Sequence, residues 1–267
     1  MHDDVELSLG QIREAWRLMC APAPGASIED LGGIFYAFSG LPIPFFNVAV
    51  INGRGLSGET LRSRAETARA WAADKQVPWF LLVTHERLLP GVDATAVLED
   101  CGLAPAIPLT GMLAQRVAPA GQHPAGLQLG VPQDDAGCAA LLDVNSLAYA
   151  MPLDEAKPVL GRRGFWKDHF PVLGMAGDTP ACCAAVLMVD GHRYVAMVAT
   201  DPTQQRRGYA DAAMRHALEA AAEVHGELPT VLHATDAGRP VYERMGYVAI
   251  SSHMFFIDKT FLPGHQA

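Results

Sequence analysis

Apolar positions in the first half of the chain follow helical and strand periodicities in turn. They recur at helical spacing from Leu9 to Met19, and Ser8 is the predicted N-cap of this helix. Later patterns predict strands over 45–51, 79–84 and 111–117 and helices over 61–75 and 94–100. The first half is therefore predicted to be an α/β structure.

The second half repeats this alternation after a Pro- and Gly-containing segment, residues 119–124, that is typical of a linker. Its patterns predict strands over 127–131, 171–175, 181–189, 193–200, 231–235 and 253–257, and helices over 135–149, 210–224 and 238–245. Gly226 is suited to end the helix that begins at Ala210. We therefore predict two domains, residues 1–118 and 124–267.

A short internal match suggests that the two halves are related. The segment Val97–Leu103 aligns with Val241–Tyr247, and three of the seven positions are identical. Each segment follows a strand–helix–strand passage, so the order of elements agrees as well. We interpret this as an internal duplication, in which Leu98 of the first half stands where the second half has Tyr242.

Composition narrows the class of protein. The chain has 267 residues, of which half are hydrophobic and 18% are charged, which favours well-filled cores over disorder. A net charge of −9 argues against a nucleic-acid or anionic-membrane partner. The N-terminus does not resemble a secretory signal, and the longest apolar run, Ala181–Val189, is too short to span a bilayer. We expect a cytoplasmic protein of unknown oligomeric state.

The five cysteines do not form a metal or disulfide pattern. None of them belongs to a Cys-x-x-Cys pair, and the chain lacks His-x₃₋₅-His spacing. We therefore expect no metal cofactor and predict that the cysteines are small buried residues.

The segment that follows Thr200 carries the strongest chemical signal. A predicted strand ends there, a proline follows, and Gln205-Arg206-Arg207-Gly208-Tyr209-Ala210 leads into an alanine-rich helix. Backbone N–H groups at a helix N-terminus have no intrahelical partners and attract anions. Gly208 allows close approach of a ligand to the backbone. The loop is therefore predicted to hold a phosphate, whereas the corresponding first-half segment, 52–58, lacks this spacing.

This loop and the later segment Ala237–Tyr247 resemble the GNAT superfamily of acyl-CoA-dependent N-acetyltransferases. The loop matches the family's Q/R-x-x-G-x-G/A pyrophosphate signature, and Tyr242 lies four residues before a Gly-aromatic pair, as in many members. The resemblance covers roughly residues 127–257 and implies two GNAT-like domains, each a mixed, mostly antiparallel sheet flanked by helices. The first would be a degenerate copy, leaving one active site per chain.

The resemblance also implies roles for individual residues. The backbone of Gln205–Ala210 would hold the pyrophosphate of acetyl-CoA, and a main-chain N–H near Val198 would polarise the thioester carbonyl. Thr235 lies where many members have an Asn that contacts the cofactor arm. The residues implied in cofactor binding are Val198, Ala199, Thr200, Gln205, Arg206, Arg207, Gly208, Tyr209, Ala210 and Thr235.

Tyr242 is the predicted general acid. Acetyl transfer to an amine passes through a tetrahedral oxyanion and releases a thiolate that needs a proton. A tyrosine of pKa about 10 stays protonated at neutral pH and can donate to a thiolate whose conjugate acid has a pKa of about 8.5. The alternative is a tyrosine that only packs between helix and sheet.

The general base is left open between several side chains. His233 precedes Tyr242 on a predicted strand, and Asp168 and His169 lie where the family shapes its acceptor pocket. Asn145 and Tyr149 either line that pocket or pack on a helix surface, and His192 is expected to be structural in a hairpin turn.

The predicted function is N-acetylation of a primary amine of a small molecule by direct attack on acetyl-CoA. A catalytically silent acyl-CoA sensor and a protein-lysine acetyltransferase are the alternatives. The acidic balance and the extra domain favour a small acceptor over a protein. A P-loop nucleotidase and a Rossmann dehydrogenase are disfavoured because their glycine signatures are missing from the loop.

Overall fold

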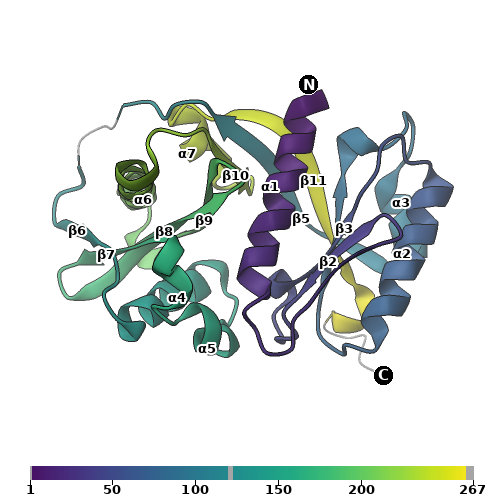
Figure 1. Ribbon diagram of the computed structural model, residues 1–267, viewed down its shortest axis with the longest axis horizontal. Helices are drawn as coiled ribbons and strands as arrows, with labels where there is room; N and C mark the ends of the chain where they lie inside the picture. The colour runs from purple at the N-terminus through teal and green to yellow at the C-terminus, as the bar shows by residue number, and fades with distance from the viewer. Residues whose placement is uncertain (1, 120–122, 263–267) are drawn as a thin grey trace. The chain divides into compact units, whose positions relative to one another are not determined.

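The structure, a computed structural model, describes residues 2–119 and 123–262 and divides into two compact units. Unit 1 comprises Met1–Met112, His233–Arg239 and Ala249–Ala267, and unit 2 comprises Leu113–Leu232 and Pro240–Val248. Each unit is a mostly antiparallel sheet with helices against it, as the sequence predicted (Figure 1).

Unit 1 is built on the strand order β1-β2-β3-β4-β11-β5. Strands β3 and β4 pair in parallel, whereas β1, β2 and β3 form an antiparallel meander and β11 is antiparallel to β4. Its elements are α1 (His2–Cys20), β1 (Ser27–Leu31), β2 (Ile34–Phe38), β3 (Asn47–Ile51), α2 (Gly58–Ala73), β4 (Phe80–Thr84), α3 (Ala94–Asp100), β5 (Leu103–Ala114) and β11 (Val248–Asp258).

The two faces of this sheet are covered by different helices. Strand β2 is buried on both faces, since alternate side chains of a strand point in opposite directions. Tyr36 belongs to the cluster formed with α2 and α3, where it stacks on Trp71 with ring centroids 4.1 Å apart. Phe35 lies under the guanidinium of Arg13 from α1, at 4.8 Å. The continuous apolar pattern of β2 therefore follows from its central position between two helical layers (Figure 1).

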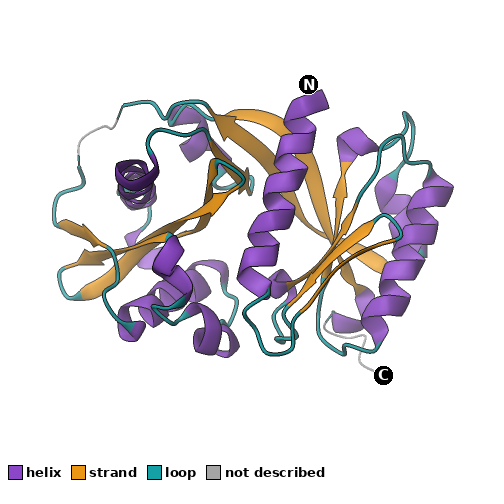
Figure 2. Ribbon diagram, in the orientation of Figure 1, coloured by secondary structure: helices purple, strands orange, loops and turns teal. Residues whose placement is uncertain are grey.

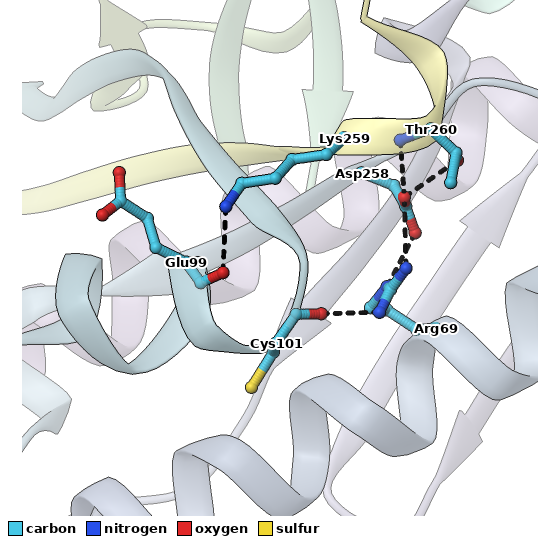
Figure 3. A network of polar contacts seen from close by, with 6 residues as sticks. All are labelled: Arg69, Glu99, Cys101, Asp258, Lys259 and Thr260. Atoms are coloured by element: carbon cyan, nitrogen blue, oxygen red, sulfur yellow. Dashed lines mark hydrogen bonds and ion pairs between the residues drawn. The ribbon is translucent and has the colours of Figure 1, made fainter. Parts of the chain in front are cut away.

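The end of β11 is fixed to unit 1 by a polar network (Figure 3). Asp258 is 6% exposed and accepts hydrogen bonds from Arg69 Nε (2.8 Å) and from the backbone and hydroxyl of Thr260 (3.0 and 2.9 Å). Burial raises the pKa of this carboxyl, but the hydrogen bonds outweigh that effect and its pKa lies below the ordinary value. Lys259 Nζ donates to the carbonyl of Glu99 at 2.9 Å, so β11 is also held to α3.

Unit 2 is built on the strand order β10-β9-β8-β7-β6 (Figure 2). Helix α6 lies on one face of this sheet, and α4 and α5 lie on the other (Figure 1). Its elements are β6 (Leu127–Gly130), α4 (Asp135–Tyr149), α5 (Lys157–Leu160), β7 (Phe170–Ala176), β8 (Thr179–Val189), β9 (His192–Thr200), α6 (Tyr209–His225), β10 (Thr230–Ala234) and α7 (Arg239–Arg244).

Most predicted elements are confirmed to within a few residues, but three predictions about the first half need correction. Ser8 is not an N-cap: it is completely buried in the middle of α1. Residues 111–114 of the predicted strand 111–117 are the end of a longer strand, Leu103–Ala114, and residues 115–117 lie outside it. The antiparallel hairpin β1–β2 was not predicted, although its Gly32-Gly33 turn between two short runs is a recognisable signal.

The spatial units do not follow the predicted sequence boundaries at 118 and 124. The chain crosses back into unit 1 at His233–Arg239, and again with the last strand, which pairs with β4 from His253–Thr84 to Ile257–Phe80. Residues 120–122 of the predicted linker lie outside the described residues. The division of the sequence into two duplicated segments stays a prediction.

Three general features bear on function. All five cysteines are free and buried, as predicted. In the described ranges 2–119 and 123–262, no cluster of three or more His, Cys, Asp or Glu side chains is arranged to bind a metal ion. No helix among those same residues has the length and apolarity needed to cross a membrane.

Candidate functional site

The phosphate-loop candidate of unit 2 joins β9 to α6 through two left-handed residues. A short 3₁₀ turn, Pro202–Gln204, follows β9, and Arg206 and Gly208 then adopt φ values of 62° and 79°. Gly208 occupies the N-cap position of α6 but has no side chain that could accept a hydrogen bond from the first turn. Glycine suits this position because L-residues rarely adopt a left-handed conformation.

The first turn of α6 is open to an anion. The earliest loop-to-helix hydrogen bond runs from Ala212 N–H to Gly208 C=O, so the N–H groups of residues 209–211 precede the helical ladder. Asp211 cannot cap these groups because Arg215 Nε holds its carboxylate at 2.9 Å. Tyr209 is buried and anchors the turn, whereas Gln205, Arg206 and Arg207 are exposed. The loop therefore offers backbone donors, a helix dipole and two mobile cationic side chains.

Strand β9 carries an irregularity just before this loop. Its register with β8 shifts between Cys183 and Ala185, so two residues of β9 oppose one of β8. Met197 lies in this bulge with φ of 54°, a conformation that costs a non-glycine residue on the order of 1–3 kcal/mol. Such strain persists only where surrounding contacts hold it, and it often marks a functional backbone.

Strands β9 and β10 are paired only where they begin. Their parallel register joins Arg193 with Thr230 and Tyr194 with Val231, and within unit 2 it extends no further. Strand β9 continues to Thr200, so the edge that includes Val198, Ala199 and Thr200 is not paired with β10 in unit 2. An extended ligand can add hydrogen bonds to such an edge.

Tyr242 lies on α7 in unit 2 and is 9% exposed. Its ring packs edge-on against Tyr247, with centroids 6.1 Å apart, and the Tyr247 hydroxyl hydrogen-bonds Thr230 Oγ1 at 2.8 Å. Burial raises the pKa of Tyr242, and the neighbouring hydroxyls of Tyr149 and Tyr247 raise it further. The phenol is therefore protonated at any physiological pH.

Two residues of α4, Asn145 and Tyr149, which the sequence offered as candidates for the acceptor pocket, contact β8 and β9. The hydroxyl of Tyr149 donates to the carbonyl of Val198 at 2.8 Å, and this side chain is about half exposed. Asn145 is buried, and its Nδ2 lies 3.6 Å from Cys183 Sγ. No sequence signal indicates these two contacts, because they depend on how α4 crosses the sheet.

The base candidates of unit 2 differ in their surroundings. Asp168 is exposed and lies 3.7 Å from Lys167 Nζ. His169 packs near the ring of Phe165, and burial lowers its pKa, although the adjacent Asp168 opposes this effect. His192 Nδ1 lies 2.9 Å from the carbonyl of Asp190 in the β8–β9 turn, as expected for a structural residue. His169 therefore keeps its neutral form more readily than an exposed imidazole would.

Two other predicted site residues belong to unit 1. Thr235 directly follows β10, and its carbonyl accepts hydrogen bonds from the N–H groups of Gly238 and Arg239, both at 3.0 Å. His233 Nε2 lies 2.9 Å from Ser8 Oγ, which also contacts Ser251 and His253. Burial places the pKa of His233 well below its ordinary value. Its role as a base is still a prediction.

The corresponding region of unit 1 is closed by its own residues. Ser57 is the N-cap of α2, and its Oγ accepts a hydrogen bond from Thr60 N–H at 3.1 Å. Beyond β3 and β4, Leu56 and Leu88 form a further parallel bridge. Leu98, the counterpart of Tyr242, is fully buried in the apolar core.

Comparison with known proteins agrees with the resemblance seen in the sequence. Residues 169–263 match the sequence description of the Acetyltransferase (GNAT) domain. No functionally curated protein matches the sequence. Among solved structures, a GCN5-related N-acetyltransferase from Kribbella flavida has a TM-score of 0.70 at 20% identity, covering 97% of this chain and 95% of that one.

Two further structures show the same fold over most of the chain. A functionally unknown conserved protein from Staphylococcus epidermidis aligns with a TM-score of 0.62 at 13% identity, over 88% of this chain and 94% of the other. A tandem GNAT protein from the clavulanic acid biosynthesis pathway aligns with a TM-score of 0.51 at 14% identity, over 94% of both chains. At these identities the likeness concerns the fold, and it supports a tandem arrangement.

Proposed function

We propose that the second half of this chain is a GNAT acetyltransferase domain with a degenerate copy before it. On this premise, the chain transfers an acetyl group from acetyl-CoA to a primary amine of a small molecule. The observation that carries this proposal is the N-terminus of α6, where Gly208 leaves the first-turn N–H groups without a side-chain cap. A pyrophosphate fits a site of this kind because its oxygens accept several N–H donors at once.

Acetyl-CoA would supply the activated acyl group, and the chain would supply binding and orientation. The N–H groups that follow Gly208 would hold the pyrophosphate, with Arg206 and Arg207 adding charge from the exposed side of the loop. The edge of β9 at Val198–Thr200 would bind the extended arm by backbone hydrogen bonds. Thr235 is proposed as a further contact to that arm.

The bulge of β9 supplies a donor for the acyl oxygen. During attack by the amine, negative charge develops on this oxygen, and a fixed N–H aimed at it stabilises the transition state. We assign that role to the backbone N–H of Val198. The strained conformation of the neighbouring Met197 supports the assignment, because it turns the strand locally out of its regular pairing.

Tyr242 is the proposed proton donor to the departing thiolate. Since burial and the neighbouring tyrosines raise its pKa, the phenol keeps its proton through and beyond the neutral range. A rate limb caused by loss of that proton should therefore lie above the ordinary tyrosine pKa of about 10. We propose His169 or a water chain as the route by which the attacking amine loses its proton.

A net charge of −9 attracts cations, and this supports a small cationic amine as the acceptor. A cytoplasmic location and the absence of nucleic-acid and membrane partners stay predictions.

The proposal is tested by thiol release from acetyl-CoA across a panel of small amines and a lysine-containing peptide. The wild type should turn over at least one small amine faster than the peptide. Tyr242→Phe should lower kcat by about 100-fold, the lower range for losing a general acid, with little change in CoA affinity. Tyr36→Phe, which removes a phenol from unit 1, is the matched control and should leave kcat unchanged.

Two results would contradict parts of this proposal. Unchanged turnover in Tyr242→Phe would remove this residue as the acid. Tight CoA binding with no turnover of any amine or peptide would favour a silent acyl-CoA sensor.

A further inference from the structure

The sulfur of Cys183 is a hydrogen-bonding centre for the bulge of β9. It lies 3.2 Å from the carbonyl oxygen of Met197, the nearer acceptor for its thiol, and 3.5 Å from that of Leu141. It accepts from Asn145 Nδ2 at 3.6 Å. Cys183 is fully buried, so these contacts are shielded from water.

This contact determines the direction of one backbone N–H of the bulge. In a trans peptide the C=O and the following N–H point in opposite directions. With the Met197 carbonyl directed at Cys183, the N–H of Val198 points away from that sulfur.

Tyr149 fixes the second peptide of the bulge. Its hydroxyl donates to the carbonyl of Val198 at 2.8 Å from the last residue of α4. The peptide between Val198 and Ala199 is thus held at its oxygen by Tyr149. The preceding peptide, which carries the Val198 N–H, is held at its oxygen by Cys183. Together the two contacts restrain both peptides of the bulge.

We propose that Tyr149 and Cys183 are positioning residues that hold the β9 bulge in one conformation, so that the Val198 N–H is already oriented toward the acyl carbonyl. The site thereby distinguishes an acyl thioester from a CoA derivative without a carbonyl. This inference rests on the proposed function, because it assigns a task within the same site. It adds that side chains of α4 and β8 maintain the strained Met197 conformation. Neither residue contacts the reacting atoms in this proposal.

The binding experiment compares acetyl-CoA with S-ethyl-CoA, which lacks the carbonyl, by calorimetry. The wild type should bind acetyl-CoA more tightly, and Tyr149→Phe should reduce this preference while leaving S-ethyl-CoA affinity within about twofold, since the pyrophosphate site is untouched. Tyr149 is half exposed, so the variant should fold. Tyr36→Phe is the matched control and should keep the wild-type preference.

The kinetic experiment measures kcat and KM for acetyl-CoA in the same variants. Tyr149→Phe and Cys183→Ala should each lower kcat by about tenfold, less than the loss from deleting an oxyanion donor itself, with little change in KM. Cys183→Ser keeps a hydroxyl donor and should restore much of kcat. A purely packing role for Cys183 would instead make Ala and Ser differ only in stability.

The outcomes separate this inference from the proposed function. If the wild type binds both ligands but turns over no amine, the proposed catalysis fails while the binding preference still tests the positioning role. If the preference and kcat are unchanged in folded Tyr149→Phe and Cys183→Ala, the positioning role is overturned. If the wild type binds neither ligand, both proposals are overturned.

Discussion

Helices α2 and α6 hold corresponding positions in the two units, yet their N-termini differ in one decisive residue. Helix α2 begins after Ser57, whose hydroxyl accepts the N–H of Thr60. Helix α6 begins after Gly208, which offers no side chain and adopts a left-handed conformation. The N-terminus of α2 is satisfied by its own cap, whereas the first-turn N–H groups of α6 have no side-chain cap.

The parallel strands before these helices differ in the same sense. In unit 1, β3 and β4 stay paired to Val50–Leu82, and Leu56 and Leu88 extend the pairing beyond them. In unit 2, the pairing of β9 with β10 ends at Tyr194–Val231. In each unit, therefore, a few local residues decide how far the two parallel strands stay paired.

The test with the largest expected effect places a bulky side chain at the uncapped N-terminus of α6. Gly208→Trp should abolish detectable CoA binding, a loss of more than about 100-fold, because the indole occupies the space at the first-turn N–H groups. Calorimetry with CoA measures this. Gly191→Trp is the matched control, since Gly191 has a similar φ of 72° and open surroundings in a turn of the same unit. Normal CoA affinity in Gly208→Trp would refute the loop assignment.

A second test concerns the buried histidines of unit 1. His253 is 1% exposed, and burial, with the charge of His85 adding to it, lowers its pKa to about 3. In the unfolded chain the imidazole binds its proton near pH 6.5. The contribution of neutral His253 to the free energy of unfolding is therefore complete above that pH, and it is lost as the pH falls toward the folded-state pKa. Each pH unit within this window should cost about 1.4 kcal/mol per histidine.

Urea unfolding measured between about pH 7 and pH 5 checks this expectation. His253→Gln should flatten the pH dependence, although the variant is less stable at neutral pH because Ser251 and Thr84 lose a partner. His169→Gln in unit 2 is the control and should change the slope less, because its side chain is only partly buried. Equal slopes in the wild type and His253→Gln would contradict the assignment.

The smallest expected effect comes from the capped helix. Ser57→Ala should lower the free energy of unfolding by about 1 kcal/mol, the usual value of an N-cap, without changing CoA affinity. Ser57→Gly removes the cap while mimicking Gly208, yet CoA should still bind once per chain because Leu56 and Leu88 remain bridged. A second CoA site in Ser57→Gly would show that the cap alone closes unit 1.

Much of the fold was predictable because its signals are local. The alanine-rich stripe of α6, the turn at Asp190–Gly191 and the Gln205–Ala210 spacing depend on nearest neighbours, and each element forms where predicted. The role of Ser8 was mispredicted because a serine before an apolar run can be either an N-cap or a buried residue within a helix. In the structure it is the second, and it contacts His233 and His253. Burial of that kind is decided by distant partners.

The sequence by itself determined the class of fold, most of its elements and the place of the Gln205–Ala210 loop between β9 and α6, because periodicity, turn residues and helix-capping chemistry act over a few positions. The tertiary structure decided what required long-range contacts: the pairing of β11 with β4, the fate of Ser8, and the contacts of Tyr149 and Cys183 with the bulge of β9. Tyr149 and Val198 are 49 positions apart, so only packing of α4 against the sheet could bring them together.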